Sequence, residues 1–554
     1  MSWWRALILG ALAAVPWYRW AWLRLRRAVH ILQLEEYDNR RALLWARRYW
    51  LADEAPVPLA VATVLFVLAV ALVLIAGGGS SPHTSGILWA AALWTGVGGI
   101  AGLRSVLMSR TAPKKPLAVT TRVKRLFGAI AIALLFLAAV LLLAGWAAGA
   151  PGRVAFVVVP LVAWLSVAAG PIPAALANLL ALPVESANRR RYCNEAAARL
   201  RAVSPRIVAI TGSYGKTTTK ELTAAVLETR YRVLKTPASF NTIMGITRVI
   251  REQLRDEHEV FVVEMGAYTR GEIRELCHFV GGPELSAIVG INEQHLERMG
   301  SIANTIRAKY EIVEGTRPGG VSVFNVDNRY CDELADKTAH VRVVRVGTCE
   351  RDRRLDLWAD NVSVNPKLMR FDVHDGDQTV TVRTRILGRH LVPNFLIALA
   401  FGKEMGVDLK QAVVRLGRVE PVGHRLAVTE ANGMIVIDDA YSSNVDGARA
   451  ALALLSELPA QRRFMVTPGI VELGPVEKER NRELGACAAA VCDTLLVVGT
   501  EPGRYVREGA EAAGLPKESV VACADLAAAQ AYLRDHMQTG DAVLFENDLP
   551  DNYA

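Results

Sequence analysis

A glycine-rich segment able to bind a phosphate spans residues 209–219 of this chain. It follows the apolar pair at 207–208 and precedes residues 220–227, whose spacing predicts a helix. A strand, a glycine turn and a helix N-terminus form an anion site, because free backbone N–H groups and the helix dipole converge on a phosphate. In such a loop Lys216 reaches the β- and γ-phosphates of a nucleotide, and the Thr217 hydroxyl binds Mg²⁺. The segment therefore predicts a chain that consumes a nucleoside triphosphate, with these further nucleotide contacts: Gly212, Ser213, Gly215 and Thr218.

Two later apolar runs, 261–263 and 287–289, are typical of buried strands, and each is followed by polar residues. Their alternation with helical patterns predicts βαβ units and a parallel sheet, in which ligands gather at the carboxyl ends of the strands. Glu264 follows the first run directly, and His295 follows the second after a short loop. A carboxylate and an imidazole at adjacent strand ends, beside a phosphate loop, are candidate Mg²⁺ ligands.

The length and composition indicate several domains in two kinds of surroundings. At 554 residues the chain is too long for one core, and three or four domains are expected. Residues 1–185 are rich in Ala, Leu, Val and Trp and carry much of the net charge of +9, which favours a membrane surface over nucleic acid. The sequence has no nucleic-acid-binding signature, so no nucleic-acid partner is expected. The seven cysteines form no CxxC pair, which argues against a zinc ribbon and for reduced thiols.

Four apolar stretches in the first part of the chain have the length of membrane spans, since a bilayer core needs roughly 20 residues. Basic residues gather before the first stretch and between the second and third, and the positive-inside rule assigns both segments to the cytoplasm. We therefore expect a multi-pass protein of a bacterial-type cytoplasmic (inner) membrane, in contact with membrane lipid and with its catalytic domains in the cytoplasm. An interfacial N-terminal segment would precede the spans. The expected spans are 57–77, 85–103, 126–148 and 154–176.

Beyond the phosphate loop, a series of short motifs follows in a fixed order. They lie at 211–218, 239–245, 264–267, 295–297, 325–328, 388–394, 437–444 and 472–474. Each is weak alone, but together they resemble the Mur ligase family, and within it the MurF type most closely, over about residues 206–549. The implied fold class is an α-helical membrane module followed by α/β domains: a P-loop parallel-sheet central domain and a Rossmann-like C-terminal domain. The expected boundaries are 1–185 for the membrane module, 186–204 for a linker, 205–418 for the ATP-binding central domain and 425–554 for the C-terminal domain.

The resemblance implies an ATP-dependent ligase that joins a carboxylate to an amine through an acyl phosphate. Lys216, His295 and Lys309 are the expected catalytic residues. Thr217 and Glu264 would hold a first Mg²⁺, and His295 a second, which Lys309 helps to place if it is carbamylated as the matching family lysine is. A carbamate is an anion, so it stabilises two nearby metal ions that an ordinary lysine would repel. The resemblance also assigns Asn325 and Asn394 to adenine, Asp439 to the ribose side, and Asn241, Arg425, Tyr441 and Asn444 to the substrates.

This chain departs from the MurF type in ways that bear on its substrates. Apolar stretches stand where the family has a soluble domain that grips a UDP-linked sugar peptide, so the acceptor carboxylate is expected to be either UDP-linked or lipid-linked. The family's DDAYNANP motif and its late KGSR stretch are altered, which leaves the amine donor, an amino acid or dipeptide, unidentified. Proteins of envelope synthesis are further candidate partners. The alternatives are a polyglutamate-type amide ligase of another envelope polymer and, in another class, a non-catalytic membrane scaffold or transporter with a P-loop domain.

Overall fold

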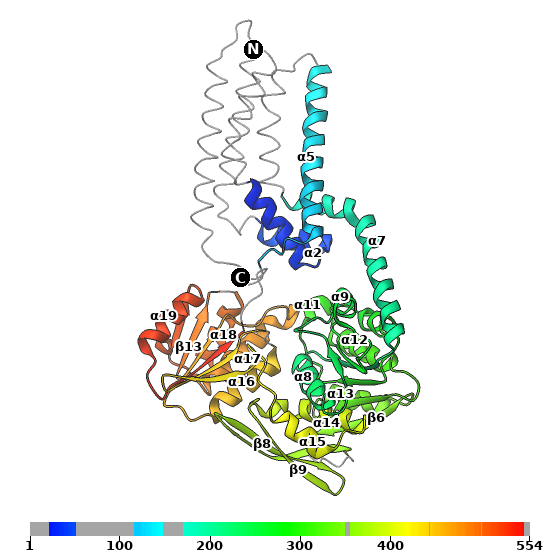
Figure 1. Cartoon of the computed structure of the whole chain (residues 1–554). Coiled ribbons are helices and arrows are strands. Elements are labelled where there is room, and N and C mark those ends of the chain that lie inside the picture. The colour runs from blue at the N-terminus through cyan, green and yellow to red at the C-terminus, as the bar shows by residue number, and fades with distance from the viewer. Residues whose placement is uncertain are drawn as a thin grey trace. The chain divides into compact units, whose positions relative to one another are not determined.

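The computed structural model describes residues 21–50, 116–147, 170–348, 355–441, 444–499 and 501–547 (Figure 1). The chain divides into two compact units, one of residues 1–188 with 550–554 and the other of residues 189–549. Helix α7 (Pro171–Val203) includes nearly all of the segment 186–204 that was expected to be a linker. That segment can continue the helix because no glycine or proline interrupts it between the proline at 183 and residue 203.

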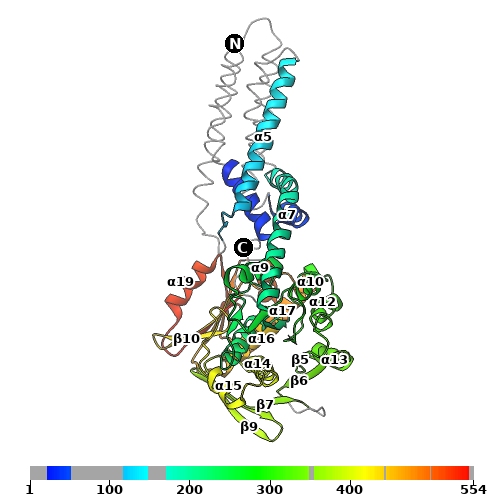
Figure 2. The same ribbon diagram turned by 45° about the vertical axis from the view of Figure 1, so that its right-hand side comes forward.

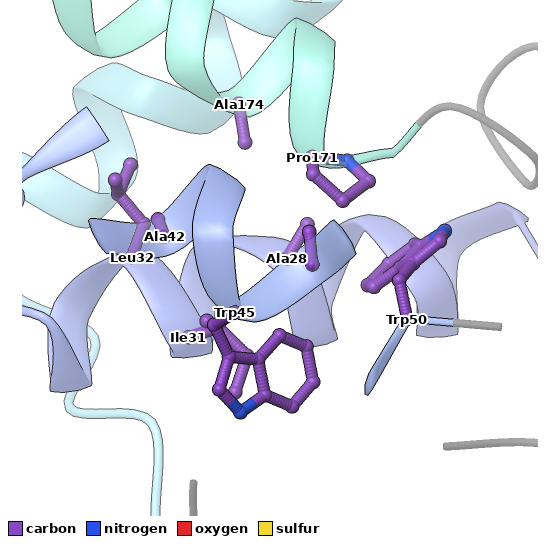
Figure 3. Close-up of a pocket in the computed structure, with 9 residues that line it drawn as sticks. Ala28, Ile31, Leu32, Ala42, Trp45, Trp50, Pro171 and Ala174 are labelled. Carbon is purple, nitrogen blue, oxygen red and sulfur yellow. The ribbon is translucent and has the colours of Figure 1, made fainter. Parts of the chain in front are cut away.

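The described part of the first unit is helical. Residues 21–34 form one helix and are followed by α2 (Asn39–Tyr49), α5 (Thr121–Ala147) and the start of α7. Figure 3 shows the small apolar cavity that Trp45 and Trp50 line together with Ala174. The guanidinium of Arg24 lies 3.7 Å from the ring centroid of Trp50, so a cation is held against the edge of this core.

Helix α5 is the one helix among the described residues that is long and apolar enough to cross a membrane, over Thr121–Ala144. Its apolar side chains are largely exposed, among them Leu135 at 71%. The expected spans 57–77 and 85–103 lie outside the described residues, as does 154–176 up to residue 169. One such helix is weak evidence for membrane insertion, and the expectation of a multi-pass inner-membrane protein is corrected by this finding.

The second unit begins with a domain of residues 206–416, here called the phosphate-loop domain, built on a nine-stranded sheet of order β2-β3-β1-β4-β5-β6-β7-β8-β9. Neighbours from β2 to β7 pair in parallel, as expected, while β8 and β9 add an antiparallel extension that was not predicted. The strands are β1 (Arg206–Thr211), β2 (Val233–Lys235), β3 (Val260–Glu264), β4 (Leu285–Ile288), β5 (Val321–Asn325), β6 (Arg342–Gly347), β7 (Leu357–Asn365), β8 (Leu368–Asp375) and β9 (Gln378–Thr384).

Helices cover both faces of this sheet (Figures 1 and 2). Alternate residues of β1 enter different cores: Val208 packs in one cluster with Leu222 of α8, and Ile207 in another with Ile246 of α9. A sheet buried on both faces explains the continuous apolar runs of its strands. The helices are α8 (Lys216–Leu227), α9 (Ile243–Gln253), α10 (Glu272–Phe279), α11 (Leu296–Met299), α12 (Ile302–Glu314), α13 (Arg329–Lys337), η1 (Arg389–Leu391), α14 (Val392–Glu404) and α15 (Leu409–Leu416).

Residues 427–546 form the second domain, here called the C-terminal domain, on a six-stranded sheet of order β10-β11-β15-β12-β13-β14. All its neighbours are parallel except β10 and β11. The elements are β10 (Ala427–Ala431), β11 (Met434–Asp439), α16 (Val445–Glu457), β12 (Arg463–Thr467), η2 (Gly474–Val476), α17 (Glu477–Ala489), β13 (Thr494–Val498), α18 (Glu501–Ala512), η3 (Lys517–Ser519), β14 (Val520–Cys523), α19 (Leu526–His536) and β15 (Ala542–Glu546).

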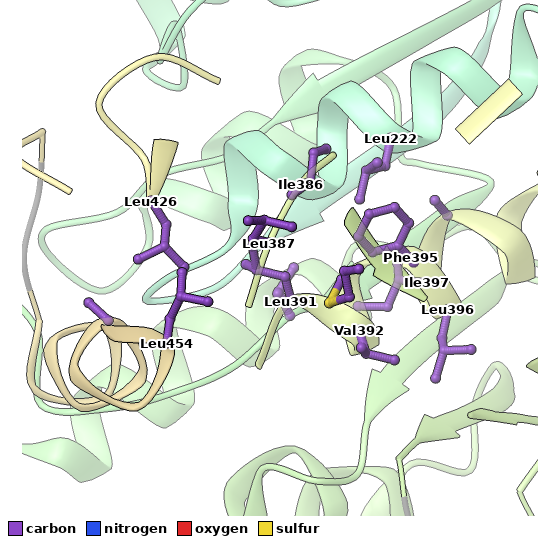
Figure 4. Packing of buried hydrophobic residues seen from close by; sticks show 14 of the residues in the cluster. Leu222, Ile386, Leu387, Leu391, Val392, Phe395, Leu396, Ile397, Leu426 and Leu454 are labelled. Atoms are coloured by element: carbon purple, nitrogen blue, oxygen red, sulfur yellow. The ribbon is translucent and has the colours of Figure 1, made fainter. Parts of the chain in front are cut away.

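One apolar core continues from the phosphate-loop domain into the C-terminal domain (Figure 4). Leu222 and Phe395 contribute to it from α8 and α14, and Leu454 contributes from α16. Leu391 of η1 and Leu426, which lies just before β10, belong to the same cluster. The two domains are therefore joined by buried apolar contacts as well as by the chain, which allows polar side chains of both to meet at one site.

Candidate active site

The loop of residues 212–215 joins β1 to the N-terminus of α8. Gly215 has φ 74°, and a Cβ there would lie 2.7 Å from Val289 Cγ1, so only glycine fits. The Ser213 N–H donates to the Gly290 carbonyl at 2.7 Å, and Lys216 Nζ donates to the Gly212 carbonyl at 2.7 Å. No side chain caps the N-terminus of α8 among the described residues, so its first N–H groups are available to an anion.

Glu264 stands at the carboxyl end of β3 and is only 1% exposed. Its Oε2 accepts a hydrogen bond from the Thr217 hydroxyl at 2.9 Å, and its Oε1 accepts one from Asn241 Nδ2 at 3.0 Å. Lys220, which is fully buried, brings its Nζ to 3.6 Å from Glu264 Oε2. The buried carboxylate is thus balanced by a buried cation, which is what keeps an ionised group in such a place.

His295 lies in the loop after β4, with φ 58°, directly before α11. Its Nδ1 is hydrogen-bonded to a carboxylate oxygen of Glu472, a residue of the C-terminal domain. The ring of Tyr268 meets the imidazole edge-on with centroids 4.9 Å apart. Burial lowers the pKa of His295, although the Glu472 carboxylate opposes the shift.

Lys309 projects from α12 and is 4% exposed. Burial, and after it the positive charge of Lys216, lowers the pKa of Lys309 to about 7. Burial likewise lowers the pKa of Lys216 to about 8, against the attraction of Glu264. Both amines thus bind their protons weakly. The nearby carboxylates offset only part of the effect that burial has on the two lysine pKa values.

One cavity of about 40 Å³ brings the expected catalytic residues together. Lys216, His295 and Lys309 line it, with Asn241 and the loop residues Gly212 and Ser213. Among the described residues no three His, Cys, Asp or Glu side chains form a metal-binding group. The Thr217 hydroxyl and Glu264 carboxylate therefore fit Mg²⁺ rather than a metal caged by protein, because Mg²⁺ takes one or two protein oxygens with phosphates and water.

Of the residues expected around the nucleoside, Asn325 and Asp439 already have hydrogen-bond partners in the structure, whereas the amide nitrogen of Asn394 has none among the described residues. Asn394, at 2% exposed, lies against Gly215, and its buried Nδ2 has no hydrogen-bond partner among the residues that the structure describes. Asn325 instead donates to the Val289 carbonyl at 2.9 Å and so ties β5 to β4. Asp439 accepts from the Leu426 N–H at 2.9 Å, and burial raises the pKa of Asp439 to about 6. An orphaned buried amide such as that of Asn394 is a place where a ligand can bind.

The expected substrate residues do not form one group. Asn241 lines the cavity, whereas Arg425 stacks on Tyr441, with its guanidinium carbon 4.5 Å from the ring centroid. The Tyr441 hydroxyl lies 3.0 Å from the Ser239 hydroxyl, so this pair reaches the phosphate-loop domain. Asn444 caps α16 and accepts from Asn292 Nδ2 at 2.7 Å. Its side chain joins the two domains and is engaged there rather than turned to a substrate.

Sequence reasoning missed three participants of the site. Glu472 was noted only as part of a motif, Lys220 only as a residue of the predicted helix, and Ser239 only as part of a motif. The signal for Lys220 was a lysine one turn beyond Lys216, on a helix that is buried apart from Lys216 and Glu221. Residues 442–443 of the motif at 437–444 lie outside the described residues.

Comparisons with known proteins agree with this geometry. The family model described as Mur ligase middle domain matches residues 210–402, and the one described as Mur ligase, glutamate ligase domain, matches residues 424–546. A UDP-N-acetylmuramoyl-tripeptide--D-alanyl-D-alanine ligase of Mycobacterium tuberculosis (strain ATCC 25618 / H37Rv) is 34% identical over 372 residues, which cover 63% of this chain and 71% of the relative.

Two solved structures are also similar. A crystal structure of MurF from Acinetobacter baumannii has a TM-score of 0.59 and 26% identity, covering 65% of this chain and 77% of that one. MurF ligase from Thermotoga maritima in complex with ADP has a TM-score of 0.57 and 23% identity, covering 65% of this chain and 80% of that one, and supports the fold alone.

Replacing Lys309 by methionine should flatten the pH dependence of stability between pH 7 and 10.5. Lysine in the unfolded chain titrates at its ordinary pKa of 10.5, whereas burial lowers the pKa of Lys309 to about 7 in the folded chain. Between these values the unfolded state holds one proton more, so the free energy of unfolding of the wild type rises with pH across this window. Below about pH 7 both states are protonated and this contribution is constant.

Chemical denaturation of the full chain at a series of pH values, in bicarbonate-free buffer, measures this slope. Lys337→Met is the matched control, because Lys337 is exposed on α13 with 71% of its side chain accessible, and it should keep the wild-type slope. Equal slopes for wild type and Lys309→Met would contradict the charge burial described above.

Proposed function

This chain belongs to the Mur ligase family, and from that membership we propose that it ligates a dipeptide amine to the peptide carboxylate of a muramoyl-linked acceptor. It is an ATP-dependent peptide ligase of the MurF type, acting in the synthesis of peptidoglycan precursors. That membership sets aside a non-catalytic scaffold or transporter. The relatives' description names D-alanyl-D-alanine and a UDP-N-acetylmuramoyl-tripeptide, which are the amine and acceptor proposed here.

The observation that carries the proposal is the cavity shared by Lys216, His295 and Lys309. Two amines and an imidazole surround a space beside the open N-terminus of α8. These groups are suited to a polyphosphate that meets a second anion, because they favour negative charge and their positions are fixed before the reaction.

In the proposed reaction a carboxylate oxygen of the acceptor attacks the γ-phosphorus of ATP, and ADP leaves. The amine nitrogen of the dipeptide then attacks the carbonyl carbon of the acyl phosphate. Inorganic phosphate departs with that carboxylate oxygen, and the amide bond forms as the amine loses a proton. Lys216 would hold the β- and γ-phosphates throughout, which keeps the reacting phosphorus in line with the carboxylate.

Mg²⁺, when bound, would supply further neutralisation of the phosphate charge. Thr217 and Glu264 would hold a first ion, since their oxygens lie together at the loop. His295 and Lys309, which line the same cavity, would hold a second ion. Asn394, with its unsatisfied buried amide, would bind the adenine side of the nucleotide, and Asp439 the ribose side.

We include a carbamate on Lys309 in the proposal. An amine must be neutral to add to carbon dioxide, and the buried setting of Lys309 next to Lys216 favours the neutral form. The product is an anion, which would relieve the repulsion between the two amines and provide oxygen atoms for a metal ion. Lys309 would then act as a ligand instead of a cation.

Carbon-13 NMR of the protein in labelled bicarbonate tests the carbamate without an activity assay. We expect one carbamate resonance in the wild type, absent in Lys309→Met and retained in Lys337→Met, whose lost amine is exposed. A spectrum without such a resonance, or a resonance that survives in Lys309→Met, would remove the carbamate from the proposal.

Arg425, Tyr441 and Ser239 form the second part of the proposed substrate site. Their contacts link the start of the C-terminal domain to the loop before α9, which also supplies Asn241 to the cavity. The half-buried guanidinium of Arg425, stacked on an aromatic ring, suits a carboxylate of the amine substrate or of the acceptor peptide. The altered motif around Asn444 leaves open glutamate as the amine substrate, as in a polyglutamate-type ligase. The assay of ADP formation described below distinguishes the two amines.

The group that carries the acceptor peptide could be UDP or a lipid. A UDP-linked acceptor follows from the relatives' description, and a lipid-linked form is the second candidate. The observation that favours the second is the exposed apolar surface of α5, which includes Phe136 at 70% and Leu143 at 67%. Both carriers present the same peptide carboxylate, so the chemistry at the cavity would not differ.

ADP formation by the purified full chain tests the function directly. With D-alanyl-D-alanine and UDP-linked or lipid-linked tripeptide, the wild type should form ADP and the joined peptide in equal amounts. Lys216→Ala should lower turnover by at least about 100-fold, because a preset group on the transferred phosphate is lost. Lys403→Ala, which breaks a surface ion pair with Asp375, should keep turnover.

Turnover with the UDP-linked acceptor alone would exclude the lipid-linked form, and the converse result would exclude the UDP-linked form. ADP formation with glutamate as the amine, and none with the dipeptide, would replace the proposal by the polyglutamate-type alternative. Equal turnover by wild type and Lys216→Ala would contradict any role for the phosphate loop.

A further inference from the structure

The loop that carries His295 is held from the C-terminal domain at several points. Asn292 Nδ2 donates to Asn444 Oδ1 at 2.7 Å. Glu293 accepts two hydrogen bonds from the guanidinium of Arg480, at 2.6 and 3.0 Å. The loop's conformation therefore depends on a domain that lies far away in the sequence and packs against it only in the folded chain.

Glu472 makes the contact at the centre of this interface. It is 9% exposed, and one of its carboxylate oxygens is hydrogen-bonded to His295 Nδ1. The other accepts from Arg298 Nη2 at 3.3 Å, and the Glu472 carbonyl accepts from the Glu297 N–H at 3.1 Å. Glu472 is thus fixed by backbone and side-chain contacts, and its carboxylate has one orientation toward the imidazole.

Both partners of this hydrogen bond adopt a backbone conformation that non-glycine residues rarely use. His295 has φ 58° and Glu472 has φ 65°, each in the left-handed region. Such conformations persist only where the surroundings determine them, and they gather at functional sites. Gly474, two residues beyond Glu472, has φ 59° and a Cβ there would lie 3.4 Å from the Glu297 backbone, so the loop of Glu472 is shaped to fit against the loop of His295.

We propose that Glu472 is a positioning residue for His295. Its carboxylate accepts the Nδ1–H of His295, which selects that tautomer and leaves Nε2 unprotonated. His295 lines the cavity with Lys216 and Lys309, so Nε2 is the ring atom with a lone pair for a metal ion or a phosphate-bound proton there. A carboxylate behind a histidine is a general device for fixing the ring and raising its strength as a ligand.

The consequence is that the C-terminal domain controls the state of a residue in the phosphate-loop domain. When the two domains are docked as in this structure, Glu472 holds His295 in one tautomer and one orientation. When they separate, His295 loses its partner and the ring can adopt the other tautomer, whose protonated Nε2 cannot ligate a metal. The inference rests on the proposed function for the identity of the reaction, but not for the tautomer.

Nitrogen-15 NMR of histidine side chains in the full chain tests the tautomer, with the His295 signals identified by their loss in His295→Gln. The wild type should show His295 with protonated Nδ1 and unprotonated Nε2. Glu472→Ala should shift these signals toward the other tautomer. Glu472→Gln should keep them, because its amide oxygen still accepts from Nδ1–H.

The kinetic expectation follows the same order. Glu472→Ala should lower kcat by about 10- to 100-fold, the usual effect of losing a residue behind a metal ligand, with KM for ATP nearly unchanged. Glu472→Gln should recover most of kcat. Arg480→Ala breaks the contact with Glu293 across the same interface and serves as the control for docking alone, so it should leave the tautomer of His295 unchanged.

An unchanged His295 tautomer in Glu472→Ala would overturn the inference, and so would an equal tautomer shift in Arg480→Ala, which would mean that Glu472 merely joins the domains. The NMR result does not depend on substrate. A wild type that is silent with every acceptor but shows the expected tautomers would therefore fail the proposed function and still support the role of Glu472.

Discussion

The burial of positive charge is the constraint on which this site depends. Lys216 and Lys309 share one cavity wall, and Lys220 is fully buried one turn along α8 from Lys216. Charges out of water are costly unless an opposite charge is close, and Lys220 has two carboxylates beside it, those of Glu221 and Glu264. A polyphosphate provides the remaining negative charge, so binding it relieves a cost that folding has already incurred. The weak proton affinities of Lys216 and Lys309 are the measurable sign of that cost.

The fold produces this arrangement through the edge of a parallel sheet. The phosphate loop, Glu264 and the loop of His295 follow β1, β3 and β4, which are neighbours in the sheet, so their side chains meet without long-range adjustment. The C-terminal domain completes the site, because Glu472 and Arg480 form hydrogen bonds with the loop of His295.

Local patterns were sufficient for the residues that follow strands and for the phosphate loop. The strand-end pattern predicted Glu264 beside the phosphate loop, and the family resemblance paired it with Thr217; the structure has their oxygens 2.9 Å apart, while their metal-binding role stays a prediction. The parallel part of the large sheet and the α/β character of both domains were also predicted correctly.

Glu472 could not be identified in this way, since it is 177 residues from His295 and only tertiary packing brings it there. The hydrogen bond of Asn444 with Asn292 depends on tertiary packing in the same way, while the predicted substrate contact of Asn444 stays a prediction. The antiparallel strands β8 and β9 were missed because strand patterns do not reveal on which edge of a sheet a hairpin pairs. Apolar stretches near the N-terminus predicted a multi-pass protein, and composition alone could not test that prediction.

Transfer of oxygen-18 from the acceptor to phosphate tests the central claim most directly, namely that the cavity of Lys216, His295 and Lys309 activates a carboxylate as an acyl phosphate. The acceptor's terminal carboxylate would be labelled, and inorganic phosphate from a complete reaction would be analysed by mass spectrometry. We predict one labelled oxygen in each phosphate released with the joined peptide, because the bond from that oxygen to phosphorus survives while its bond to carbon breaks. Phosphate without label, formed at the same rate with and without the amine, would mean that the site transfers the phosphoryl group to water and would contradict the assignment.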